Sequence, residues 1–144
     1  MLGMFDVAKT VCELAGWNLS HLKLQKILYI LQMFYLGENG KPLFYANFEA
    51  WDFGPVEPNL YKRLKVVGSD NVPQWLFILE DGISRDNPDY TFIERLTNKL
   101  LAKSPSFLVS YVHDEHSAWK RLYEKGKKNI QITNADIQEE YERR

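Results

Sequence analysis

Cysteine is almost absent from this sequence, since Cys12 is the only one among 144 residues. A single cysteine excludes an intramolecular disulfide and a cysteine-based zinc site. Cys12 lies in a periodic apolar stretch, which favours a small buried side chain. We therefore expect a protein of a reducing compartment and a cytoplasmic location.

Long apolar runs are also missing. The longest extends over residues 27–36 and is interrupted by Gln32, whereas a membrane-spanning helix needs about 20 apolar residues. The N-terminal segment has no basic stretch followed by an apolar block, so it does not have the pattern of a secretory signal. We expect no association with a membrane.

The sequence has no excess of one charge and no established catalytic motif. The formal net charge is -1, so no overall field attracts a polyanion, which counts against nucleic acid as a partner. The P-loop, dinucleotide-binding and serine-hydrolase patterns G-x-x-x-x-G-K-[ST], G-x-G-x-x-G and G-x-S-x-G are all absent. We expect no catalytic residues, no cofactor and no enzymatic activity.

Aromatic residues, in contrast, are plentiful, with 4 Trp, 8 Tyr and 8 Phe. Most belong to a core, but this number leaves rings for a binding surface. The length suits one domain, and no internal repeat or linker divides the chain. We predict a single domain over residues 1–144.

Helical periodicity dominates the pattern. A wide apolar stripe begins after a cap at Asn18 or Ser20 and predicts a central helix that ends near residue 36. Its predicted core residues are Leu24, Leu28, Leu31 and Tyr35. Further helices are predicted over residues 6–14, after Pro58, over 89–103 and 106–112, around Trp119, and after a cap at Thr133 or Asn134.

Three segments are less regular. Residues 47–53 fit either a helical turn or an extended piece, and residues 75–79 fit either a short strand or a helical turn. The charged tail, residues 139–144, is expected to fray. The predicted fold is mainly α, a single compact multi-helix domain with room for a short β-hairpin or extended segment.

Gly54 and Pro55 are predicted to fix a chain reversal, because proline locks φ and restricts the preceding residue. This reversal would place Trp51 beside the central helix, either as a structural ring or as an interface anchor. Glu49 and Asp52 are not interpreted as an acid–base pair, since no nucleophile, phosphate cradle or metal site accompanies them.

The segment from His113 to His116 offers the best candidates for site chemistry. On a helix these two histidines share a face, and with Asp114 or Glu115 they could bind a divalent metal. The alternatives are a capping or hydrogen-bonding role and a partner contact. No third strong ligand is evident, so we expect no bound metal.

Two sequence runs carry a family resemblance. Residues 23–29 read KLQKILY and residues 49–56 read EAWDFGPV. They are similar to the K-L-Q-K-L-L-Y and E-A-W-x-x-G-P-V runs of the Panacea domain family, the SocA-like antitoxins and phage-associated GepA-like proteins. Tyr61 matches a family tyrosine, and His113 and Trp119 match a late T-H-x-x-x-x-x-W feature. Val112 and Ala118 depart from that feature, where the family has Thr and often Pro.

The resemblance covers residues 6–61 well, 107–141 more loosely and the middle poorly. It implies the antitoxin of a bacterial or prophage toxin–antitoxin pair, which binds its cognate toxin directly. In one branch of the family the antitoxin also delivers the toxin to an ATP-dependent protease. Two alternatives remain: a phage-derived protein that binds a host factor, and a metal-dependent hydrolase that uses His113 and His116.

The candidate residues fall into two groups. The candidates for contact with a partner are Lys23, Lys26, Trp51, Tyr61, His113 and Trp119. The two lysines would present charge to an acidic partner, or would simply flank the apolar stripe in solvent. The residues of the structural motif are Leu24, Gln25, Leu28, Tyr29, Glu49, Ala50, Gly54, Pro55 and Val56.

Overall fold

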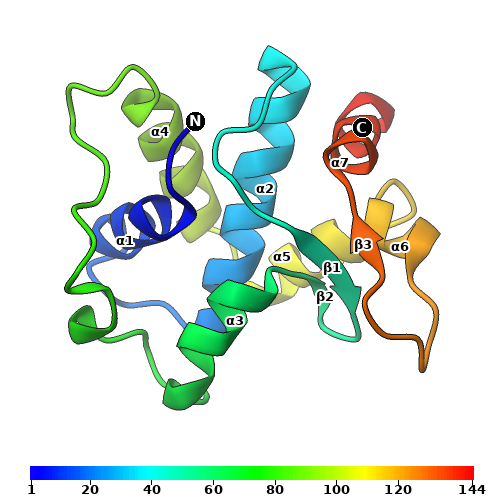
Figure 1. Cartoon of the computed structure of the whole chain (residues 1–144), viewed down its shortest axis with the longest axis horizontal. Coiled ribbons are helices and arrows are strands. Elements are labelled where there is room, and N and C mark those ends of the chain that lie inside the picture. Colours follow the sequence, from blue (N-terminus) through cyan, green and yellow to red (C-terminus); the bar gives the residue numbers. More distant parts are fainter.

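The computed structural model describes the whole chain from Met1 to Arg144 and is mainly α-helical, as predicted (Figure 1). Its α-helices are α1 (Met4–Leu14), α2 (His21–Asn39), α3 (Pro58–Leu64), α4 (Tyr90–Leu101), α5 (Pro105–His113), α6 (Ala118–Leu122) and α7 (Asn134–Arg143). Two short 3-10 helices, η1 (Lys65–Val67) and η2 (Gln74–Phe77), and three strands, β1 (Phe48–Trp51), β2 (Gly54–Val56) and β3 (Gln131–Ile132), complete the fold. The segment 75–79 is thus a helical turn.

Helix α2 is the central element and lies between α4 and α7 (Figure 1). Ser20 caps its start, since its hydroxyl accepts a hydrogen bond from the Lys23 N–H at 3.3 Å. Leu24, Leu28 and Leu31 are fully buried, and Tyr35 is buried as well, so the predicted core is confirmed. The stripe is wide because α2 packs against α1, α4, α5 and α7. Neither α2 nor any other helix has the length and apolar character needed to cross a membrane.

Gly37 allows α7 to pack closely on α2. A Cβ atom at this position would overlap the ring of Tyr141 in α7. That ring packs edge-on against Phe34, with centroids 5.5 Å apart. The contact fixes the last helix against the centre of the fold.

The prediction that the charged tail frays is wrong. Helix α7 continues to Arg143, and Glu140 within it is only 1% exposed. The Glu140 carboxylate accepts hydrogen bonds from the Tyr29 hydroxyl at 2.6 Å and from the Arg144 guanidinium at 2.6 Å. Arg144 also donates to Asp114 and to the Tyr111 carbonyl. The tail is ordered because a buried carboxylate needs these donors.

The three strands form an antiparallel sheet in the order β2-β1-β3. In the β1–β2 hairpin, Ala50 pairs with Pro55 and Trp51 pairs with Gly54. The chain reverses at Asp52 and Phe53, two residues before the predicted Gly54-Pro55 position. Gly54 follows the turn with φ of +100°, a conformation that favours glycine. Pro55 lies in an outer strand, where proline is tolerated.

Candidate functional site

Two buried polar side chains of α2 fasten the β1–β2 hairpin and the segment that follows it. The Gln25 side-chain amide donates to the Glu57 carbonyl at 3.1 Å, and its oxygen accepts from the Glu57 N–H at 2.9 Å. The Lys26 ammonium donates to the Phe53 carbonyl at 3.0 Å. The run at 23–29 and the run at 49–56 are therefore in direct contact, although the second half of α2 and the loop before β1 separate them in the sequence.

The Lys26 side chain has an internal role. It is 5% exposed, and burial lowers the pKa of its ammonium group. The Phe53 carbonyl oxygen accepts a hydrogen bond from this buried ammonium group. Lys26 thus joins the hairpin turn to α2.

Lys23 lies away from the hairpin. Its ammonium donates to the carbonyl oxygens of Leu101 and Lys103, each at 3.2 Å. A cation at the C-terminus of α4 pairs with free carbonyl groups and with the helix dipole. The structure therefore gives Lys23 a partner within the chain.

Glu57 is a key residue that the sequence analysis did not single out. Its carboxylate is 2% exposed and accepts hydrogen bonds from the backbone N–H groups of Asn59, Leu60 and Asn47 at 2.6, 3.1 and 3.0 Å. It caps α3 and ties that helix to the segment before β1. The sequence feature that could have identified Glu57 is its position immediately before Pro58, where a helix cap is expected.

Trp51 links two groups of aromatic side chains at the hairpin. Its ring packs edge-on against Tyr61 of α3, with centroids 4.9 Å apart. Its indole N–H donates to Glu49 at 2.9 Å, and its carbonyl accepts from the Trp119 indole at 2.6 Å. The hairpin is joined to α2 through Lys26, whereas the Trp51 ring packs on α3.

The cluster continues through α5 and α6. The His113 ring meets Trp119 edge-on at 4.2 Å, and Trp119 stacks on Tyr123 at 4.8 Å. The Tyr123 hydroxyl donates a hydrogen bond to Asp52 in the hairpin turn. Tyr123 was not predicted as a site residue, although its spacing of four from Trp119 places both on one helical face. We call Trp51, Tyr61, His113, Trp119 and Tyr123 the hairpin aromatic cluster.

Gly54 allows His113 to approach the hairpin. A Cβ atom on Gly54 would lie 3.0 Å from the His113 ring. On its other side, the His113 Nδ1 atom lies 2.6 Å from the Val109 carbonyl. The ring is thus held between its own helix, the hairpin and Trp119.

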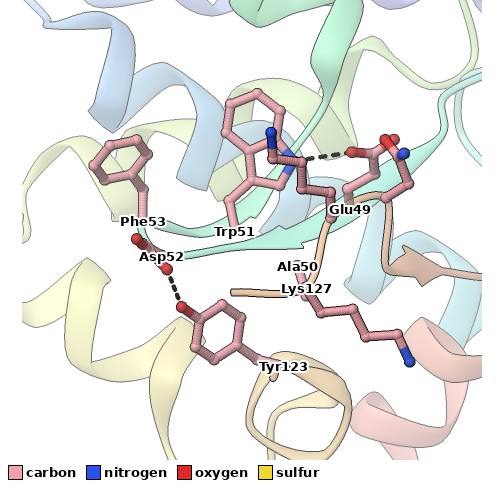
Figure 2. Close-up of a pocket in the computed structure, with 9 residues that line it drawn as sticks. Glu49, Ala50, Trp51, Asp52, Phe53, Tyr123 and Lys127 are labelled. Atoms are coloured by element: carbon pink, nitrogen blue, oxygen red, sulfur yellow. Dashed lines mark hydrogen bonds between the residues drawn. The ribbon is translucent and has the colours of Figure 1, made fainter. Parts of the chain in front are cut away.

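A groove of about 360 Å³ lies between the hairpin and the loop after α6 (Figure 2). Its lining residues are Glu49, Ala50, Trp51, Asp52, Phe53, Tyr123, Lys127, Lys128 and Asn129. The Phe53 side chain at the turn is 52% exposed. Figure 2 shows the Tyr123 hydroxyl directed at Asp52, which joins the two walls.

The two histidines at the end of α5 do not converge. His113 faces Val109 and Trp119, whereas the His116 ring lies 3.8 Å from Asp114. No group of three or more His, Cys, Asp or Glu side chains is arranged to hold a metal ion. The geometry lacks the donor set of a zinc or other divalent metal centre.

Comparison with known proteins supplies a family. The model of the family described as "Antitoxin SocA-like, Panacea domain" matches residues 24–120. The protein named Antitoxin SocA, from Caulobacter vibrioides (strain NA1000 / CB15N), is 34% identical over 113 residues. That alignment covers 70% of this chain and 58% of the relative, so the chain spans somewhat more than half of the relative's length. No solved structure matches.

Proposed function

The chain belongs to the SocA-like antitoxin family with the Panacea domain, and from this premise we propose that it neutralises a protein toxin by direct binding, without turnover. The family match and the identity to Antitoxin SocA support an antitoxin role. The contact with the toxin, and the surface that makes it, are our own inference. Trp, Tyr and Arg side chains commonly carry most of the binding energy at protein interfaces.

We assign the toxin contact to the hairpin aromatic cluster and the adjoining groove. The observation that supports this assignment is the way α2 holds the hairpin. Gln25 and Lys26 bind the main chain of Glu57 and Phe53. The Phe53 side chain at the hairpin tip is nevertheless 52% exposed. A preorganised surface loses little conformational entropy on binding. Three candidates from the sequence, Trp51, Tyr61 and Trp119, are half-buried in the same cluster.

Lys23 and Lys26 act in this proposal as supports and not as contacts, because both ammonium groups bind carbonyl oxygens of the chain. His113 orients Trp119 and packs against Gly54. The partner contact then depends on rings, which commonly dominate the binding energy of an interface.

The test is co-expression of the neighbouring gene with and without this protein in a bacterial host. We expect the neighbour to be toxic alone, growth to be restored with this protein, and the two products to co-purify. Phe53→Ala should weaken rescue and complex formation. Tyr45→Ala is the matched control, since Tyr45 is an aromatic side chain that is 70% exposed and lies outside the groove lining.

Two results would count against the proposal. A toxic neighbour that neither loses toxicity nor co-purifies would refute direct neutralisation. A harmless neighbour would favour the alternative of a phage-derived protein with a host partner. Delivery of the toxin to an ATP-dependent protease is a finer version of the proposal, and it predicts that the toxin level falls on co-expression, whereas direct neutralisation leaves that level unchanged.

A further inference from the structure

The hairpin wall of the groove carries carboxylates that already have hydrogen-bond donors within the chain. Glu49 accepts from the Trp51 indole at 2.9 Å and from the Gln131 side-chain amide at 3.2 Å. Asp52 accepts from the Tyr123 hydroxyl. These hydrogen bonds fix both carboxylates on the hairpin wall of the groove.

The opposite wall carries two ammonium groups without a firm counterion. Lys127 pairs with Glu124 at 3.2 Å, but both side chains are about two-thirds exposed (63% and 67%), and an ion pair of this kind contributes little. Lys128 forms no ion pair within the chain. Both side chains can accept carboxylates from a partner at small cost.

The loop that carries these lysines is anchored to the hairpin at both ends. At its start, Tyr123 donates to Asp52. At its end, the Ile130 carbonyl accepts from the Ala50 N–H at 2.9 Å. The lysines thus line the same groove as Trp51 and Phe53, so that charged and apolar side chains border one groove.

We propose that this groove binds an acidic segment of the toxin, with an apolar side chain against the Trp51 and Phe53 rings and carboxylates on Lys127 and Lys128. The inference rests on the proposed function. The volume of about 360 Å³ lies at the small end of ligand pockets, which suits a few side chains of a protein segment. The formal net charge of -1 gives a nucleic acid no overall attraction.

The experiment compares two double variants of equal charge change in the complex with the toxin. Lys127→Glu with Lys128→Glu alters the groove lining. Lys120→Glu with Lys125→Glu alters two exposed lysines outside that lining and is the control. All four positions are exposed, so the variants should keep the fold.

We expect the groove variant to weaken the toxin Kd by about tenfold or more, because close charge pairs at interfaces couple by about 1.5 kcal/mol or more. Its association rate should also lose salt dependence. The control variant should change the Kd by less than about threefold. Among overlapping peptides that cover the toxin, those that bind should carry Asp or Glu next to an apolar residue.

Several outcomes would overturn the inference. Equal losses in both variants would indicate general charge attraction, and an unchanged Kd in the groove variant would remove the lysines from the contact. Basic binding peptides would reverse the assigned charge. A single-stranded oligonucleotide that binds more tightly than the toxin, and is released by the groove variant, would assign the groove to nucleic acid. If the unmodified protein forms no complex with the toxin, the proposed function fails. If the complex forms and the groove variant binds with the same Kd, only this inference fails.

Discussion

The side-chain amide of Gln25 makes two hydrogen bonds with the main chain of Glu57, 32 residues later in the sequence. Its nitrogen donates to the carbonyl and its oxygen accepts from the N–H group, in the manner of one step of a β-ladder. This pair joins the run at 23–29 to the residue that directly follows the run at 49–56. The first run supplies the donor and acceptor that the chain needs directly after the second.

The first prediction concerns this pair. Gln25→Leu should lower the free energy of unfolding by about 2–4 kcal/mol, because it leaves a buried N–H and a buried carbonyl of Glu57 without partners. Urea denaturation of both proteins measures the change. Gln74→Ala is the control, since Gln74 is exposed, and it should differ from the parent by less than about 0.5 kcal/mol. Equal effects at the two positions would contradict the role assigned to Gln25.

The second prediction concerns the core of α2. Leu28→Ala should lower the free energy of unfolding by about 2–5 kcal/mol, since Leu28 is fully buried and its truncation leaves a cavity. Leu22→Ala, in the same helix at a side chain that is 42% exposed, should have a much smaller effect. Chemical denaturation of the two variants side by side gives the comparison. A similar loss at both positions would show that α2 is not packed as described.

The third prediction concerns pH. Burial, with a smaller contribution from Glu13, raises the pKa of the Cys12 thiol from 9.0 to about 12. Above pH 9 the unfolded chain loses a proton that the native state keeps, so the free energy of unfolding falls as pH rises from 9 towards 12. The expected slope from Cys12 is about 1.4 kcal/mol per pH unit.

Cys12→Ala isolates this contribution. Denaturation at about pH 8 and about pH 10 should show a smaller loss of stability in the variant than in the parent, by about 1 kcal/mol. The Lys26 ammonium, with a pKa lowered by burial, acts in the opposite direction but is present in both proteins and cancels in the comparison. Identical losses of stability in the two proteins would mean that the Cys12 thiol ionises as readily in the native state as in the unfolded chain.

The fourth prediction concerns the metal-dependent hydrolase alternative. Protein incubated with zinc and then dialysed should keep far less than one equivalent, because His113 and His116 face different neighbours and lack a third ligand. Elemental analysis measures the metal content. One retained equivalent that is lost in a His113→Ala variant, but kept in a His21→Ala variant, would restore the metal-site hypothesis.

The helices were predictable because their information is local. The apolar stripe from Leu24 to Tyr35 repeats at helical spacing, and Ser20 and Pro58 are residue types that start helices. The segment 47–53 stayed open for a different reason. Its first part, Phe48–Trp51, is a strand that pairs with Gly54–Val56 in the hairpin and with Gln131–Ile132, about eighty residues later. No property of the segment itself contains the second pairing.

The candidate site shows the same division. The family resemblance pointed to Trp51, Tyr61, His113 and Trp119 as separate positions. It could not show that Trp51 packs on Tyr61, that His113 packs on Trp119, and that the Trp119 indole donates to the Trp51 carbonyl and so joins the two pairs. The fraying predicted for residues 139–144 was wrong because the charges of Glu140 and Arg144 look solvent-directed in the sequence. Only the burial of Glu140 against Tyr29 reveals their internal role.

The sequence by itself therefore determined the mainly helical class, the central helix, its apolar core and the family, since each depends on the order and spacing of neighbouring residues. The tertiary structure decided that Lys23 and Lys26 bind the chain's own carbonyl groups, that the turn lies at Asp52 and Phe53, and that Lys127 and Lys128 border the groove. The physical reason is that a charged or polar side chain takes its role from the partner it meets in space. That partner is set by long-range packing, which local periodicity does not contain.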